Sequence, residues 1–211
     1  MTLKLHCFGE SGHSYKVALA LNLAELDWTP VYVDFFRGGT RAPGHLALNE
    51  MGECPVLEDG EMVLSQSGVI LDHLSEKTGR FGLHDPAIRR EVLRWVLWDN
   101  HKMSSMVGIT RFLMNFVPEE KRSAEVIGWA QGRCAGAYKT LDAALAGRDW
   151  LVGDTVSAAD LSCCAYLYYD EPFGFDRRAF PNIDRWLDGI AALPGWKHPY
   201  DLMPRAFGVA A

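Results

Sequence analysis

Long apolar runs, basic clusters and paired-cysteine motifs are all missing from this 211-residue chain. No apolar run approaches the roughly 20 residues that a membrane-spanning helix needs. The formal net charge is −6 at pH 7, and lysine and arginine form no cluster that would suit a nucleic acid. These absences predict a protein that binds neither a membrane nor a nucleic acid.

Cysteine is present, but not in a pattern that suits disulfides or metals. The chain has five cysteines, an odd number, and none form a Cys-x-x-Cys pair. The cysteines and histidines do not show metal-ligand spacing either, so no metal site is expected. The first residues, Met1 to Lys4, lack the apolar segment of a secretory signal. Reduced thiols in a cytoplasmic protein are the simplest interpretation.

The first third of the chain alternates between the apolar periods of strands and helices. Leu3, Leu5 and Cys7 alternate with more polar residues, as in a strand, and Asp59-Gly60 separates two short apolar runs, as in a hairpin. The pattern predicts strands near 3–8, 31–35, 55–58 and 62–64, a polar loop over 9–14, and helices over 16–26, 43–48 and 66–76. Strands mixed with helices in this order predict a mixed sheet packed against helices.

The strand patterns end at a segment whose glycine and proline content is typical of a linker. Residues 77–86 contain Gly79, Gly82 and Pro86. Only helical periodicity follows, over 89–116, 127–145 and 181–193, with a capping-box start at Ser157 and Asp160. The sequence therefore predicts an α/β domain over residues 1–78 and an all-α domain over residues 87–211.

The stretch from Gly52 to Ser67 carries a family resemblance. It contains Pro-Val-Leu-x-Asp-Gly, beginning at Pro55, and then x-Leu-Ser-Gln-Ser-x-x-Ile-Leu. This pattern resembles the glutathione-binding half of the cytosolic glutathione transferases. The resemblance implies a thioredoxin-like domain followed by a helical one, with Pro55 in the cis form. It also implies that the Cys54 backbone pairs with the cysteinyl part of glutathione, while Gln66 and Ser67 hold the γ-glutamyl carboxylate.

The same resemblance points to Ser11 as the catalytic residue. Several transferase classes have Ser-x-x-x-x-(Arg/Lys)-Val between the first strand and first helix, and this chain has Ser11 before Lys16-Val17. A free thiol with a pKa near 8.5 is mostly protonated at neutral pH. A hydroxyl that donates to sulfur, together with the helix N-terminus, favours the reactive thiolate. Ser14 is the alternative candidate, and His13 is expected in the same pocket.

Further ligand contacts are predicted from side chains near these motifs. Lys16, Arg41 and His45 are candidates for the glycyl carboxylate of glutathione. The resemblance implies that the long helix after the linker forms the pocket for the second substrate. Trp98, His101 and Lys102 share neighbouring positions on that helix and are the candidates there.

The leading hypothesis is a cytoplasmic, homodimeric glutathione transferase for detoxification, with glutathione as co-substrate and a small electrophile as second substrate. One alternative is a glutathione-dependent disulfide or peroxide reductase that uses the bound thiol or Cys54. Another is a glutathione-binding module without catalysis. The sequence carries no local pattern that identifies the electrophile.

Overall fold

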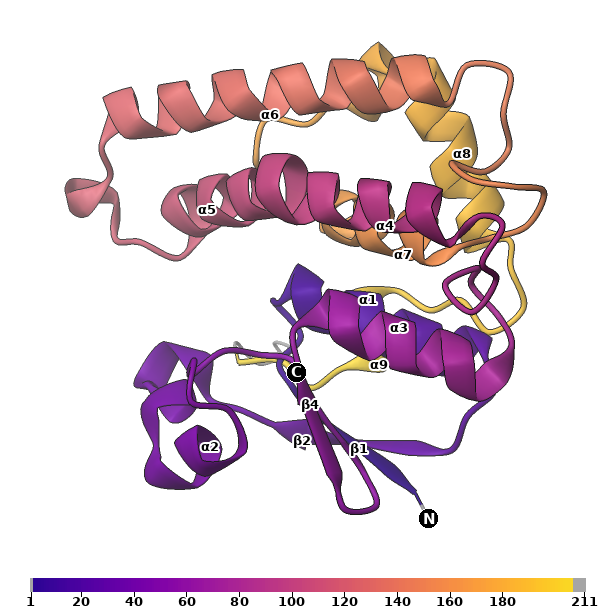
Figure 1. The fold of residues 1–211 in the computed structure, drawn as a ribbon. Coiled ribbons are helices and arrows are strands. Elements are labelled where there is room, and N and C mark those ends of the chain that lie inside the picture. Colours follow the sequence, from indigo (N-terminus) through magenta and orange to yellow (C-terminus); the bar gives the residue numbers. More distant parts are fainter. Residues whose placement is uncertain (1, 207–211) are drawn as a thin grey trace.

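The computed structural model describes residues 2–206 and arranges them in two layers (Figure 1). A sheet and its helices form one layer, and a bundle of helices forms the other. The elements are β1 Leu3–Cys7, α1 Gly12–Leu23, β2 Trp28–Tyr32, α2 Pro43–Leu48, β3 Val56–Asp59, β4 Met62–Ser65, α3 Ser67–Thr78, α4 Arg89–Trp98, α5 Ser104–Asn115, α6 Ala124–Ala144, α7 Ala158–Cys164, α8 Pro181–Ala191 and α9 Pro199–Leu202. The order confirms the predicted thioredoxin-like unit followed by helices.

The sheet is mixed and four-stranded, with the order β2-β1-β3-β4. β1 pairs in parallel with β2 and antiparallel with β3, so the first strand stands inside the sheet. This placement explains why Leu3, Leu5 and Cys7 are buried, as their alternation predicts. The loop that follows β1 therefore leaves from the interior of the sheet.

The first helix begins earlier than its apolar period predicts. α1 starts at Gly12, so the predicted loop over 9–14 is wrong in its second half. Ser11 takes the N-cap position, and its Oγ accepts the Ser14 N–H at 3.1 Å. The polar residues Gly12, His13 and Ser14 hide the helix start from a search for periodic apolar residues.

The predicted hairpin is present, with its turn shifted by one residue. β3 and β4 pair as far as Asp59 with Met62, so Gly60 and Glu61 are the central residues. Only Gly60 of these has a positive φ, of 64°. This arrangement places glycine at the first central position, where a left-handed φ favours it.

The helical layer starts with one nearly continuous rod. α4 passes through a π-helical segment, Asp99–Met103, directly into α5, which matches the predicted helix over 89–116. α7 begins with the predicted capping box. The Ser157 side chain accepts the backbone N–H of Asp160, and the Asp160 carboxylate accepts the backbone N–H of Ser157 at 2.8 Å. Asp160 also accepts the indole N–H of Trp186 at 2.9 Å, which ties α8 to α7.

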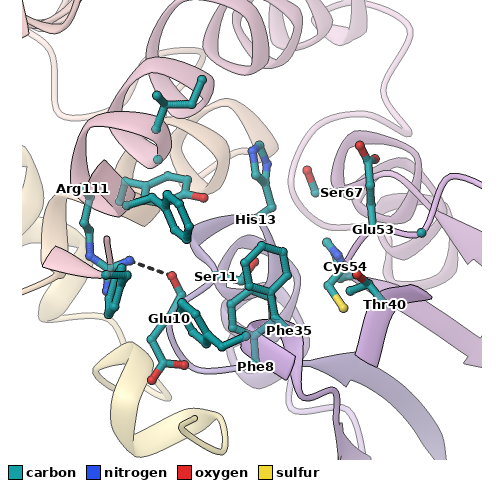
Figure 2. A pocket seen from close by; sticks show the side chains of 18 of the residues that line it. Phe8, Glu10, Ser11, His13, Phe35, Thr40, Glu53, Cys54, Ser67 and Arg111 are labelled. Carbon is teal, nitrogen blue, oxygen red and sulfur yellow. Dashed lines mark hydrogen bonds between the residues drawn. The ribbon is translucent and has the colours of Figure 1, made fainter. Parts of the chain in front are cut away.

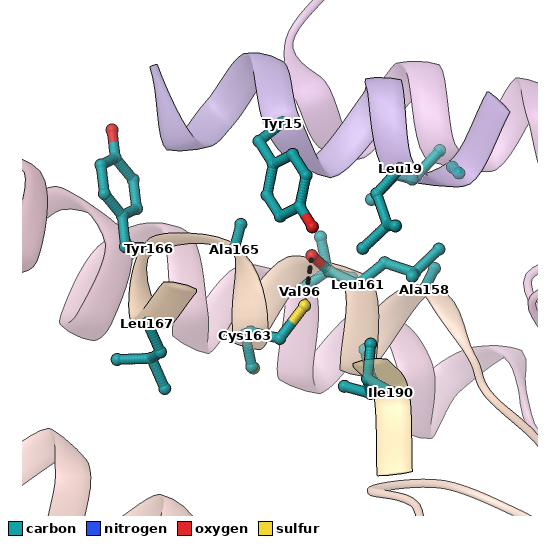
Figure 3. Packing of buried hydrophobic residues seen from close by; sticks show 14 of the residues in the cluster. Tyr15, Leu19, Val96, Ala158, Leu161, Cys163, Ala165, Tyr166, Leu167 and Ile190 are labelled. Atoms are coloured by element: carbon teal, nitrogen blue, oxygen red, sulfur yellow. Dashed lines mark hydrogen bonds between the residues drawn. The ribbon is translucent and has the colours of Figure 1, made fainter. Parts of the chain in front are cut away.

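Apolar packing joins the two layers. α1 is buried on almost every side, because it lies between the sheet and the helical layer and contacts both α3 and α7. Figure 3 shows Tyr15 and Leu19 of α1 facing Leu161 and Ala165 of the helical layer. The domain division at 78 and 87 stays a prediction, and residues 207–211 of the predicted second domain lie outside the described residues. Across residues 2–206, no helix has both the length and the apolar character needed to cross a bilayer.

Candidate active site

A cavity of about 810 Å³ opens between the β1–α1 loop and the helical layer (Figure 2). Both layers contribute to its wall. The lining residues include Phe8, Glu10, Ser11, His13, Phe35, Phe36, Thr40, Arg41, Glu53, Cys54, Pro55, Gln66, Ser67, Asn100, Gly108, Ile109, Arg111, Phe112, Phe116 and Tyr166. The volume is in the range of small-molecule sites, so the cavity can hold a ligand of that size.

Ser11 stands in the middle of this wall, at the beginning of α1. Its extended backbone, with φ −89° and ψ 108°, is the ordinary conformation of an N-cap. Because Oγ accepts the Ser14 N–H, the Ser11 hydroxyl keeps its own proton for donation to a ligand. Ser14 is fully buried and does not line the cavity, so the structure favours Ser11 over Ser14.

The loop that carries Ser11 is held by residues of the helical layer and of the segment after α9. Tyr169 donates its hydroxyl to the Gly9 carbonyl at 2.7 Å, and Arg111 donates to the Glu10 carbonyl at 2.7 Å. The Gly9 N–H in turn donates to the Pro204 carbonyl at 2.6 Å. These contacts fix the backbone directly before Ser11 and so fix the direction of its hydroxyl.

Small polar groups gather at one end of the cavity. Figure 2 shows Ser67, Glu53, Cys54 and Thr40 close together there. Ser67 is the first residue of α3, and a helix N-terminus favours an anionic group. The Cys54–Pro55 bond is cis, as the resemblance implies. The ladder of β3 begins at Val56, so the Cys54 backbone lies just past its end, at the cavity.

Gln66 holds an unusual backbone conformation at the same end. Its φ is +68°, a value rare for residues other than glycine, asparagine and aspartate. Its side-chain amide donates to the Glu53 carboxylate at 2.9 Å. A residue kept in a sparsely populated conformation beside a cavity is typical of a ligand site.

Aromatic rings line the opposite end. Phe8 stacks on Phe35 with ring centroids 4.8 Å apart, and Phe36 stacks on Phe112 at 6.4 Å. Phe116 extends the group, with its centroid 5.2 Å from Phe36. Phe35 and Phe112 keep 39% and 40% of their surface exposed, so this wall offers apolar area to a ligand. We call Phe8, Phe35, Phe36, Phe112 and Phe116 the phenylalanine wall.

A buried ion pair lies beneath the cavity. Lys16 Nζ donates to the Asp99 carboxylate at 2.5 Å and to Asn100 Oδ1 at 3.1 Å, and both charged side chains are fully buried. The hydroxyls of Ser104 and Ser162 also donate to Asp99, at 2.8 Å and 2.6 Å. The prediction that Lys16 binds a glycyl carboxylate is therefore wrong, because its charge is already paired in the core.

Comparison with known proteins identifies the family of this chain. The family model described as "Glutathione S-transferase, N-terminal domain" matches residues 1–76, and the one described as "Glutathione S-transferase, C-terminal domain" matches residues 106–194. The chain belongs to the glutathione S-transferase family.

Individual relatives span most of the chain. Maleylacetoacetate isomerase of Pseudomonas aeruginosa is 32% identical over 208 residues, which cover 93% of this chain and 96% of that protein. Disulfide-bond oxidoreductase YfcG of Escherichia coli is 28% identical over 194 residues, 89% of each. The structure of a glutathione transferase from Burkholderia graminis, with two glutathione molecules bound per subunit, has a TM-score of 0.82 at 25% identity. It covers 92% of this chain and 85% of that one.

Most of the site residues that the sequence predicts for this glutathione S-transferase surround the cavity. Ser11, His13, Cys54 and Pro55 line it, together with Gln66 and Ser67. His45 does not line it, because its ring turns to the Glu53 carbonyl, 3.0 Å away. The roles of the lining residues stay predictions.

The second-substrate residues predicted on the long helix lie elsewhere. Trp98, His101 and Lys102 are not among the lining residues, and Trp98 packs edge-to-face on Trp95 with centroids 5.2 Å apart. The same helix lines the cavity at Asn100 and then again from Gly108 onward. A role in second-substrate binding for these residues stays a prediction that the cavity does not favour.

Burial sets the titration of three groups in and beneath the cavity wall. It raises the pKa of Cys54 to about 12, and that of Cys7, next to Cys54, also to about 12. Burial, with a smaller effect of the Lys16 charge, lowers the pKa of His13 to about 3. At neutral pH the Cys54 thiol and the His13 imidazole that line the cavity are therefore neutral, as is the buried Cys7 thiol.

Proposed function

We propose that this chain is a glutathione transferase that activates the thiol of bound glutathione for attack on a small electrophile. The observation that carries the proposal is the shared cavity. Ser11 at the start of α1, Ser67 at the start of α3 and the backbone of Cys54 all line it. Glutathione is an anionic tripeptide with one thiol, and these groups match its sulfur, its carboxylate and its extended backbone in turn.

The proposed chemistry needs no protein nucleophile. The Ser11 hydroxyl donates a hydrogen bond to the sulfur, and the positive end of α1 adds to the stabilisation of the thiolate. Both effects lower the pKa of the bound thiol, whose proton is released to solvent. The thiolate then attacks an electrophile that the phenylalanine wall holds beside it, so proximity lowers the barrier further.

The relatives support a glutathione-dependent reaction and extend its range. One is named for isomerisation of maleylacetoacetate and another for disulfide-bond oxidation and reduction. A reductase in which the Cys54 thiolate acts gains no support from this site, because burial raises the Cys54 pKa to about 12. Reduction by the glutathione thiol itself, and binding without catalysis, are outcomes that the experiment below separates.

We also propose that the protein is a cytoplasmic homodimer. Exposed apolar side chains on α3 and α4 support a self-association surface, since Val69 is 51% and Leu97 is 68% exposed. Sedimentation equilibrium with the wild type and with Leu97→Glu tests this point. We expect the substitution to shift the dimer towards the monomer.

Calorimetric titration with glutathione tests the main proposal directly. Wild-type protein should bind with a Kd in the micromolar to millimolar range, and Ser67→Ala should weaken binding about tenfold because a carboxylate loses one hydrogen bond. Ser105→Ala is the matched control, since that hydroxyl donates to the His101 carbonyl away from the cavity. Absence of heat in wild type at millimolar glutathione would overturn the proposal.

Conjugation and reduction are then measured on the same preparation. Glutathione is offered with benzyl chloride in one assay and with hydroxyethyl disulfide in the other. A transferase consumes benzyl chloride faster than the uncatalysed reaction. Turnover of the disulfide alone would show that the protein is a reductase and not a transferase. Turnover of neither compound would show that it binds glutathione without catalysis.

A further inference from the structure

A second cavity, of about 400 Å³, lies between the chain that follows α7 and the chain that follows α8. Its wall is formed by residues of the segment 167–177, by Ala191 at the end of α8, and by Trp196 and His198 before α9. No described residue lines both this cavity and the active-site cavity, so the two are separate. The volume suits a ligand with one or two rings.

Aromatic rings supply the apolar part of this wall. Trp196 and Phe175 each keep part of their surface exposed. Trp196 packs against Tyr168 with ring centroids 5.2 Å apart, and Phe175 stacks on Phe173 at 6.1 Å. Rings held in place in this way offer a flat apolar surface to a ligand, and the face of an indole also attracts a cation.

The charged groups of the wall leave an excess of negative charge. Asp170 and Glu171 contribute two carboxylates. Arg177 also lines the cavity, but its guanidinium donates to Asp184 at 2.5 Å and to Asp188 at 2.6 Å, so two carboxylates already balance it. A cationic ligand is therefore attracted to this cavity, whereas an anionic one is repelled.

His198 does not offset this excess. Its Nε2 donates to the Tyr168 carbonyl at 2.9 Å, and its Nδ1 accepts the Tyr200 N–H at 3.3 Å. A ring nitrogen that accepts a hydrogen bond carries no proton, so the imidazole is neutral in this arrangement. The Asp170 carboxylate, 3.9 Å from Nε2 and on a side chain that is 87% exposed, therefore stays available to a cationic ligand.

One carboxylate of the second cavity also reaches the active site. Glu171 accepts from Arg111 Nε at 3.1 Å and from Arg111 Nη2 at 2.9 Å. Arg111 lines the active-site cavity and donates to the Glu10 carbonyl at 2.7 Å, directly before Ser11 (Figure 2). A single ion pair thus connects the two cavities, with its carboxylate in the wall of one and its guanidinium in the wall of the other.

We propose that the second cavity is a regulatory site for small aromatic compounds that carry an ammonium group. The aromatic ring of the ligand packs on Trp196 and Phe175, and its ammonium binds the carboxylates of Asp170 and Glu171. An ammonium that pairs with Glu171 competes with Arg111 for the same carboxylate, so an occupied cavity weakens the ion pair. Binding stands independently of the proposed transferase function, whereas the regulatory effect rests on it.

The occupied site is expected to act on the bound thiol through Ser11. Glu171 and the Tyr200 hydroxyl fix the guanidinium of Arg111, which in turn holds the carbonyl directly before Ser11. When the ammonium takes Glu171, this backbone is held less firmly, and the Ser11 hydroxyl is directed less well at the sulfur. The pKa of the bound thiol then rises, and kcat/KM at pH 7 falls about threefold to tenfold.

Calorimetric titration with phenethylamine tests the binding. Its primary amine is protonated at pH 7, as a lysine side chain is, while phenethyl alcohol and 3-phenylpropionate are its neutral and anionic counterparts. We expect a Kd of about 1 mM or lower for the amine, and at least about tenfold weaker binding of the other two compounds. Similar affinity for all three compounds would overturn the proposal.

Two substitutions locate the bound amine. Ala191→Phe fills the cavity and should abolish binding, while Ala192→Phe, at the exposed neighbouring position outside the wall, is the matched control. Asp170→Asn removes a charge from an exposed side chain, so it leaves the packing intact and should weaken binding about threefold. Unchanged affinity in either Ala191→Phe or Asp170→Asn would overturn the proposed site.

The regulatory effect is read from the ultraviolet absorbance of the glutathione thiolate, followed against pH. Saturating phenethylamine should raise the pKa of the bound thiol in wild type and in Ala192→Phe, but not in Ala191→Phe. Binding of the amine without this rise would overturn the regulatory role. If wild type forms no thiolate even without the amine, the transferase function fails, and the calorimetric titration still decides whether the cavity binds the amine.

Discussion

The two ends of the cavity differ in how they are built. The polar end uses mainly the backbone and short side chains from Cys54 to Ser67, in one hairpin and the start of α3, with Thr40 added from the segment before α2. At the aromatic end, Phe8 directly follows β1, Phe36 lies in the segment after β2, and Phe112 lies on α5. One end is a continuous motif and the other is assembled by the fold.

This difference assigns a different physical task to each end. Hydrogen bonds from fixed backbone groups recognise one polar ligand and tolerate little change. Stacked rings recognise shape and apolar area, so they accept related ligands and change with single substitutions. We infer that glutathione recognition is constant across variants of this chain, whereas the choice of electrophile is adjustable. The predictions that follow test this division, from the largest expected effect to the smallest.

The largest effect is expected at Asp99, in the buried ion pair that lies beneath the cavity. Asp99→Ala leaves Lys16 as an uncompensated buried charge and removes the acceptor of Ser104 and Ser162. We expect the free energy of unfolding to fall by about 3–5 kcal/mol, measured by urea denaturation. Ser105→Ala, on the neighbouring turn, should lower it by less than about 1 kcal/mol. Equal stability of Asp99→Ala and wild type would show that the pair does not support the site.

The second effect concerns Ser11, which lies between the two ends and is proposed to act on the glutathione thiol. Ser11→Ala should lower kcat/KM by about tenfold to a hundredfold for every electrophile, because the thiolate loses its hydroxyl donor. Ser14→Ala is the control, since that hydroxyl is buried and does not line the cavity. Steady-state kinetics with two unlike electrophiles measure both variants. A loss confined to one electrophile would contradict the division between the ends.

The third effect belongs to the aromatic end alone. Phe112→Ala removes a ring that stacks on Phe36, so KM for an aromatic electrophile should rise about tenfold. The KM for glutathione in the same variant is the internal control and should stay within about twofold of wild type. A parallel rise in both KM values would show that the wall also holds glutathione.

A fourth effect concerns His13, which stands between the ends. Its folded-state pKa of about 3 lies below the ordinary value of 6.5, so the unfolded chain binds the extra proton first. The stability that neutral His13 contributes is complete above about pH 6.5 and is lost as the pH falls towards 3. Between pH 7 and pH 5 wild type should lose about 2 kcal/mol more than His13→Gln, measured by urea denaturation at each pH. Equal losses would show that His13 titrates normally.

The smallest effect is expected at Cys54, whose backbone and not its thiol is proposed to bind the ligand. Since its pKa is raised to about 12, the thiol should react slowly with iodoacetamide at pH 7. Cys54→Ala should leave kcat/KM for conjugation within about twofold of wild type. Rapid alkylation, together with loss of disulfide turnover in Cys54→Ala, would restore the reductase hypothesis.

The same contrast explains how much the sequence predicts. Turn and cap chemistry is local, so the hairpin at Asp59-Gly60, the box at Ser157 and the order of the elements can all be read from neighbouring residues. The residues of the polar end follow from the same stretch. The start of α1 is not predicted correctly, because Gly12 and His13 give no apolar period.

The aromatic end has no such local pattern. Phe36 and Phe112 are far apart in sequence and meet only because α5 crosses the segment after β2. A periodic helix offers several faces, and the sequence favoured the face of Trp98 and Lys102 without showing where the helix would meet the sheet domain. The adjacent pair Phe35-Phe36 before Gly38 was the one available indication of an aromatic wall. Tyr166, in the turn after α7, is likewise recognisable as a lining residue only in three dimensions.

The π-helical segment Asp99–Met103 has a consequence for how this helix can change. A π turn holds one residue more than an α turn, and each residue of an α-helix advances the direction of its side chains by about 100°. Because the wide turn already accommodates that extra residue, removing one residue from the segment would convert it to an α turn and leave Gly108 and Phe112 on the faces that they now occupy. The same deletion inside α5, before Gly108, would rotate both residues by about 100° and turn Phe112 out of the cavity. The π segment is thus the point at which this helix can lose a residue without changing either end of the cavity.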